Sequence, residues 1–155
     1  MKLNVLQWRD LALFLDRIPQ KELPTTADVR KCVGAVEQIR EGIDKQAKEY
    51  EKLYQEANLI TVPASKKIAK LREGLSEAEI KESKEIQKIV DKSNADLKPI
   101  NEKLNKLDLK YSKEEAELDL KDDYKGFIKD HWETHLRKQY DNTKAMVKVA
   151  EAFEI

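Results

Sequence analysis

The chain has few of the residues that break or cross-link a fold. Its 155 residues include one cysteine, four glycines and four prolines, and aromatic side chains make up 6% of them. The single cysteine, Cys32, cannot form a disulfide bond within the chain. Scarce glycine and proline beside abundant alanine, glutamate, lysine and leucine are typical of elongated helical proteins. We therefore expect an all-α fold, organised as one helical domain over residues 1–155.

The chain also lacks a net charge and a long apolar run. Its 30 lysines and arginines balance 30 aspartates and glutamates, so no overall basic field attracts nucleic acid or an anionic membrane. No apolar stretch approaches the length that a bilayer requires, and the first residues do not resemble a signal peptide. The sequence thus predicts a soluble, cytoplasmic protein with no membrane partner.

What the chain does contain is a heptad repeat from Thr26 to Ile60, in which only Gln46 interrupts the apolar stripe. A stripe of this kind on a charged helix has to be covered by another helix. Cys32 lies in it, at a position that suits a small buried hydrophobe better than a reactive thiol. The two series of the repeat are Val29, Val36, Ile43, Tyr50, Ala57 and Cys32, Ile39, Gln46, Leu53, Ile60.

Capping residues and prolines indicate where the helices of an antiparallel, coiled-coil-like hairpin begin and end. Thr25 or Thr26 can cap the first arm, and Pro63 is expected to end it because proline has no N–H to donate. Ser76 and Glu79 form a capping box for the second arm. We expect arms at 26–60 and 76–107 and a tip at 61–75. Pro99 predicts a kink in the second arm, with a break as the alternative.

The polar residues of the two apolar stripes predict the register of this hairpin. Gln46 and Ser93 are the polar seam residues of the two arms, and pairing them avoids a buried amide without a partner. In that register Leu53 faces Ile86, and Gly42 lies beside Pro99. A glycine there would make room for the turn that the proline distorts.

The remaining segments predict shorter elements around the hairpin. Residues 3–18 read as a short amphipathic helix that ends at Pro19, with Trp8 on its outer side. Residues 107–120 alternate apolar and polar side chains, which favours a small β-hairpin, although a frayed helix is an alternative. Residues 122–153 read as a longer C-terminal amphipathic helix, with an interruption near 141–143.

No group of residues in the sequence predicts catalysis, a cofactor or a metal site. His131 and His135 share a helix face, but glutamate does not directly follow the first histidine as in zinc proteases, and two ligands are too few. Acidic residues between Glu114 and Asp123 form a run instead of a pair that converges in a pocket. We therefore expect a protein that is not an enzyme and that carries no cofactor or metal.

The candidate interaction surface has two parts. The first is a cluster of exposed basic residues at the expected hairpin tip, and the second consists of aromatic residues of the C-terminal helix, although that aromatic stripe fits a core better than a ligand site. No aromatic residue is interleaved with the basic cluster, so we do not expect nucleic-acid binding. The residues are Lys66, Lys67, Lys70 and Arg72 in the basic tip, and Trp132 and Tyr140 in the C-terminal helix.

The first sixty residues resemble small, poorly characterised helical proteins of tailed bacteriophages. The resemblance lies in a short N-terminal helix, a brief linker and a charged helix, with no diagnostic motif. It implies a phage protein that acts in the host cytoplasm by binding. The residues that carry it are Leu11, Phe14, Leu15 and Ile18, followed by Arg30, Glu37, Glu41 and Glu49 to Glu51.

Pattern and resemblance together predict a non-catalytic, protein-binding role as a structural or assembly accessory factor. One alternative is an inhibitor or regulator of a host enzyme or defence complex, and a second is nucleic-acid binding through the basic tip. A homodimer is one way to cover the apolar residues Val33, Tyr54 and Ile89, which a two-helix seam leaves outside. Packing of the terminal helices against these residues is another way to cover them.

We predict that the purified protein does not bind nucleic acid measurably at physiological salt. Binding through the basic tip would neutralise phosphates, so its affinity would fall steeply with salt and on replacing Lys66, Lys67, Lys70 and Arg72 by glutamine. Fluorescence anisotropy with labelled DNA and RNA measures this. A micromolar or tighter dissociation constant would contradict the prediction.

Overall fold

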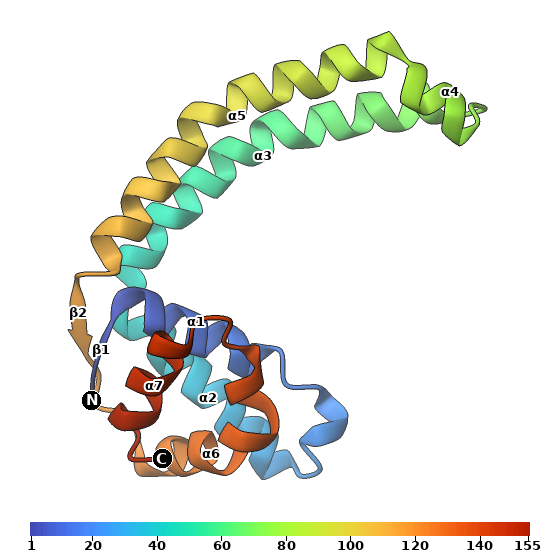
Figure 1. The fold of residues 1–155 in the computed structure, drawn as a ribbon. Helices are drawn as coiled ribbons and strands as arrows, with labels where there is room; N and C mark the ends of the chain where they lie inside the picture. The colour runs from blue at the N-terminus through green and yellow to red at the C-terminus, as the bar shows by residue number, and fades with distance from the viewer. The chain divides into compact units, whose positions relative to one another are not determined.

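A computed structural model describes all residues, 1–155, and confirms the all-α fold (Figure 1). Its contacts divide the chain into two compact units, where the sequence predicted one domain. The terminal unit comprises Met1–Ala47 and Asp108–Ile155, and the hairpin unit comprises Lys48–Leu107. None of the helices combines the length and the apolar character that a membrane span requires.

The terminal unit contains most of the apolar core. Helix α1 (Val5–Asp16) packs on α2 (Thr26–Gly42), which packs on α6 (Asp122–His131). Trp8, expected on the outer side of α1, is instead fully buried, and its indole N–H donates to the Ala116 carbonyl at 2.8 Å. That bond satisfies the one polar group of the ring, which is why the tryptophan can lie in the core.

A two-stranded antiparallel sheet replaces the expected β-hairpin at 107–120. Strand β2 (Glu115–Glu117) pairs with β1 (Lys2–Asn4) at the other end of the chain, with Leu3 opposite Ala116. Helix α5 takes up the first part of the segment, since it continues to Tyr111. The alternating pattern therefore indicated a real strand, but its partner is remote in sequence.

The C-terminal segment is a series of short elements, where the sequence predicted one longer helix. After α6 come a π-helical turn η2 (Trp132–Leu136), a 3₁₀ turn η3 (Arg137–Gln139) and helix α7 (Thr143–Ala152). A further 3₁₀ turn, η1 (Gln20–Glu22), lies between α1 and α2. The expected interruption near 141–143 is present, and Asn142 caps α7 through its side-chain oxygen.

The predicted cap at Thr25 and the predicted capping box at Ser76 are both present, although the box at Ser76 begins the short helix that precedes the second arm. The Thr25 hydroxyl accepts from the Asp28 N–H at 3.1 Å and donates to the Asp28 carboxylate at 2.6 Å, which holds the pKa of Asp28 below its ordinary value. The Ser76 hydroxyl accepts from the Glu79 N–H at 3.3 Å, and the Ser76 N–H donates to the Glu79 carboxylate at 2.7 Å. These bonds satisfy N–H groups that the first turn of a helix leaves open.

The hairpin arms have different bounds from those expected. The helix that begins at Thr26 is interrupted at Ile43, and α3 then runs from Asp44 through Pro63 to Arg72. Pro63 does not end the arm, and the basic segment after it is the last part of α3. A short helix α4 (Glu77–Glu82) precedes α5 (Lys84–Tyr111), which passes through Pro99 without a break.

Helices α3 and α5 lie side by side and antiparallel in the hairpin unit (Figure 1). The heptad positions of both arms are the covered ones. On α3, Tyr50 and Leu53 are buried and Ala57, Ile60 and Ala64 are half-buried. On α5, Ile86 and Ile100 are buried, and the half-buried positions are Val90, Ser93, Leu97, Leu104 and Leu107.

The predicted register is wrong. Leu53 lines a hollow with Leu107 and not with Ile86, and Ile60 and Ala64 line a second hollow with Ile89 and Ser93. The Gln46 amide donates to the Glu114 carboxylate at 2.7 Å, and Gly42 lies against the Leu118 side chain. Helices α3 and α5 have nearly equal lengths, 29 and 28 residues. Because the chain reverses between Arg72 and Lys84, the position of that turn determines which residues of the two helices face each other.

Chemical cross-linking should distinguish the two registers. In a Cys32→Ser background, Ala64→Cys with Ser93→Cys should be bridged within one chain by a short bis-maleimide, because both positions line one hollow. Leu53→Cys with Ile86→Cys, the pair that the sequence-derived register brings together, should remain unbridged. Mass spectrometry of the tryptic peptides identifies the bridged pair, and the intact mass before digestion shows that the bridge lies within one chain. Bridging of the second pair in place of the first would contradict the observed register.

Candidate interaction surface

The seam between α3 and α5 contains a hollow of about 420 Å³ with mainly apolar walls. Leu53 and Leu107 supply the apolar floor, with Leu53 only 8% exposed. Charged side chains stand around it: Glu49, Lys52 and Glu56 from α3, and Lys103 and Lys106 from α5. An apolar floor inside a charged rim can accept an apolar side chain of another molecule.

A second hollow, of about 240 Å³, lies nearer the turn of the hairpin. Its apolar side chains include Leu59 and Ile60 from α3 and Ile89 from α5, and Leu59 is 78% exposed. Small residues explain the open space, because Ala64 and Ser93 leave the seam underfilled at this level. Tyr54 and Val62, also on α3, are about half exposed.

Both hollows open on the same side of the hairpin. On α3, the pair Lys52 and Leu53 in the first hollow stands one heptad before Leu59 and Ile60 in the second. Positions one heptad apart share a helix face. The α5 lining residues follow the same spacing, with Leu107 two heptads after Ser93. We call this side of the hairpin, with its two hollows, the seam groove.

Only part of the sequence-predicted surface lies at the seam groove. Of the basic tip, Lys67 lines the second hollow, while Lys66, Lys70 and Arg72 are exposed elsewhere at the end of α3. Sequence reasoning missed Lys103, Lys106 and Leu107. Their signal was present, since Leu107 continues the apolar stripe of α5 and the two lysines flank it.

The aromatic half of the predicted surface belongs to the core of the terminal unit. Trp132 is 3% exposed, so it is not available as an interaction residue. Tyr140 is half-buried, with its ring centroid 4.7 Å from that of Phe14 and 5.7 Å from that of Trp132. Its hydroxyl is buried without a hydrogen-bond partner, and burial raises the pKa of Tyr140 above its ordinary value.

The two histidines stack on one another. The ring centroids of His131 and His135 are 5.6 Å apart, and the His131 ring also stacks on Phe127 at 4.1 Å. His135 Nε2 lies 3.9 Å from a carboxylate oxygen of Glu22. No three histidine, cysteine, aspartate or glutamate side chains are grouped as metal ligands would be. These contacts indicate that the two histidines are packing residues of the terminal unit.

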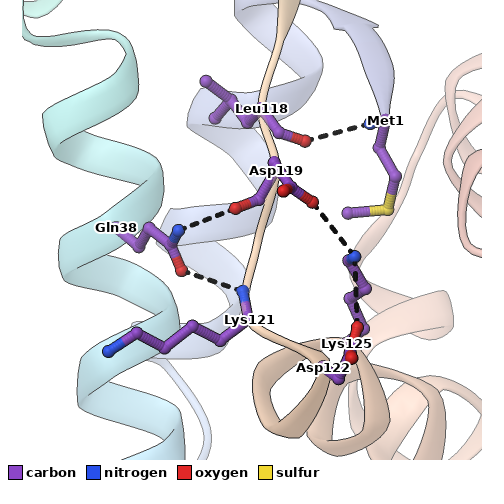
Figure 2. A network of polar contacts seen from close by, with 7 residues as sticks. All are labelled: Met1, Gln38, Leu118, Asp119, Lys121, Asp122 and Lys125. Carbon is purple, nitrogen blue, oxygen red and sulfur yellow. Dashed lines mark hydrogen bonds and ion pairs between the residues drawn. The ribbon is translucent and has the colours of Figure 1, made fainter.

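The acidic run after Glu114 is engaged in structural contacts (Figure 2). The Gln38 amide donates to the Asp119 carbonyl at 2.9 Å and accepts from the Lys121 N–H at 3.2 Å, so it pairs with the backbone as a strand would. Lys125 Nζ lies 3.3 Å from carboxylate oxygens of both Asp119 and Asp122, and the Asp119 contact raises the pKa of Lys125. Asp119 and Asp122 therefore share Lys125 as a partner.

Cys32 is confirmed as a buried residue. The residue is 6% exposed, and its thiol donates to the Leu15 carbonyl at 3.4 Å. Burial raises its pKa to about 11, with the charge of Asp16 as a smaller cause. Because the thiolate is the reactive species, this thiol is protonated and inert at neutral pH.

We expect the native protein to react slowly with a thiol reagent such as dithionitrobenzoate at pH 8, and the protein unfolded in guanidinium to react at the rate of a free thiol. Absorbance at the thionitrobenzoate maximum measures both rates. The native rate should rise as the pH approaches the pKa of about 11. Equal rates in the native and unfolded protein at pH 8 would contradict the buried position.

The seam groove thus combines apolar hollows that can accept side chains with a charged rim that can orient them. The chain matches no family model, no curated protein and no solved structure.

Proposed function

We propose that this protein acts without catalysis, by binding another protein through the seam groove of its hairpin unit. The observation that carries the proposal is the shortage of core in that unit. Its buried apolar side chains are Tyr50, Leu53, Ile86 and Ile100, whereas the terminal unit contains all the others. Two helices cover only one stripe of each other, so their remaining apolar surface is available to a partner.

The exposed apolar residues support the same role. A leucine that is 78% exposed contributes nothing to the core, yet Leu59 stands at the rim of a hollow beside the half-exposed Val62. Clusters of exposed apolar side chains on soluble domains frequently mark protein interfaces. The phage resemblance of the first sixty residues adds the finer proposal, a structural or assembly accessory factor in the host cytoplasm, with an inhibitor of a host complex as the alternative.

The test is site-specific photo-cross-linking with the full-length protein in the cells that produce it. A benzophenone amino acid in place of Leu59 should yield protein adducts, because this side chain stands at the groove. The same amino acid in place of Asn94, an exposed residue that lines neither hollow, is the matched control and should yield few. Gel mobility and mass spectrometry identify the adducts.

Two outcomes would contradict the proposed function. Adducts at neither position would show that the groove has no protein partner under these conditions. Adducts at Leu59 that nuclease treatment removes would assign the groove to nucleic acid.

A further inference from the structure

The two hollows of the seam groove are spaced as the side chains of a helix are. Equivalent residues on α3, Leu53 in the first hollow and Ile60 in the second, are one heptad apart. On α5, Leu107 in the first hollow and Ser93 in the second are two heptads apart. At a rise of about 1.5 Å per residue, the hollows are therefore separated by about 10 to 20 Å along the helices. A third helix that lies along the groove places apolar side chains on one face at every heptad, and so at both hollows. An extended strand or a loop has no such repeat.

Lysines dominate the rim of the groove. Five lysines line the two hollows, against the three carboxylates of Glu49, Glu56 and Asp96. None of the five lysines lies within ion-pairing or hydrogen-bonding distance of a partner. They stand on both arms and at both hollows, so a helix in the groove meets unpaired positive charge along its flanks. The lysines are Lys52, Lys67, Lys92, Lys103 and Lys106.

We propose that the partner of the seam groove is an amphipathic α-helix with an apolar stripe of heptad spacing and acidic residues beside that stripe. This inference rests on the proposed function and names the chemistry of the partner. The apolar side chains of the helix fill the hollows at Leu53 and at Ile60, and its carboxylates pair with lysines such as Lys103 and Lys106. The result is a three-helix arrangement in which α3 and α5 supply two of the helices.

The apolar hollows favour a helix over nucleic acid as the occupant. Phosphates would satisfy the lysines, but a nucleic-acid backbone has no apolar side chain to fill a hollow floored by Leu53 and Leu107. Burial of apolar side chains in the hollows supplies the binding free energy. The lysines make the groove prefer helices that carry acidic residues. Long-range attraction between lysines and carboxylates also speeds association, which makes the interaction sensitive to salt.

The probe is a synthetic peptide of three heptads with leucine at the two stripe positions and glutamate at the flanking positions. A second peptide, with lysine in place of every glutamate, is the matched control. Like charges along the flanks disfavour self-association of either peptide. By fluorescence anisotropy against the full-length protein, the glutamate peptide should bind at least about tenfold more tightly than the lysine peptide, with a difference that shrinks in high salt.

Variants of the protein test whether the peptide binds in the seam groove. Lys103→Glu with Lys106→Glu should weaken binding of the glutamate peptide by about tenfold or more, through charge repulsion at the first hollow. Lys84→Glu with Lys98→Glu makes the same charge change at exposed positions of α5 that line neither hollow, and should change it by less than about twofold. Ser93→Leu fills the second hollow and should weaken binding while raising the melting temperature. Circular dichroism checks that each variant is folded.

Several results would overturn the inference. They are equal affinity for the two peptides, equal loss in the two charge variants, or displacement of the glutamate peptide by an equal concentration of duplex DNA. A dimer in sedimentation equilibrium that the Lys103→Glu, Lys106→Glu variant dissociates would instead make a second copy the occupant. If any of these occurs while Leu59 still cross-links to a protein, the proposed function stands and only the acidic helix is wrong. Absence of cross-links would overturn both.

Discussion

One apolar stripe runs through α2 and α3, and the interruption at Ile43 divides it between two partners. Before the interruption, Cys32, Val36 and Ile39 are buried in the terminal unit, where α2 packs on α1 and α6. After it, Tyr50 and Leu53 are buried in the hairpin unit, where Leu53 lines a hollow with Leu107 of α5. A continuous stripe therefore serves two cores. The first of these cores is complete, whereas the second is only two helices deep and remains open along one side.

The open side of the hairpin follows from the size of the residues in its seam. Ala64 stands where a larger side chain would fill the space between α3 and α5, and Ser93 lines the same hollow. Underfilled seams lose dispersion contacts, so the hairpin is less stable than the same arms with larger residues. A bound helix restores those contacts. Stability of the hairpin and occupancy of the groove are thus linked, because a ligand that binds only the folded form stabilises it.

Local signals in the sequence predicted helix starts and buried faces well. The cap at Thr25 and the capping box at Ser76 depend only on residues within one turn, and the heptad stripe depends only on spacing, so these features could be predicted without the fold. The bounds of the first arm could not be predicted from such local signals. Proline costs a helix interior about 3 kcal/mol in isolation. Packing in the seam outweighs that cost at Pro63, and the longer arm displaces the register.

Features that join distant parts of the chain were beyond sequence reasoning. Strand β2 pairs with β1 at the other end of the chain, and Trp8 is buried because a carbonyl of β2 accepts its N–H. The sequence indicated part of the groove, since Leu107 belongs to the apolar stripe of α5 and lysines flank it. What the sequence could not show was that Leu53 faces Leu107, because that depends on where the hairpin turns.

Pro63 has a chemical consequence for the groove beyond the path of the helix. Proline has no N–H, so the carbonyl of Leu59, four residues earlier, loses the donor that any other residue at this position would supply. Leu59 and Pro63 both line the second hollow, so the residues that lack this helix hydrogen bond belong to the groove. A serine, threonine or asparagine on a bound helix can donate to the Leu59 carbonyl. Such a hydrogen bond is directional, and it would hold the bound helix at one position where apolar contacts alone permit sliding by a heptad.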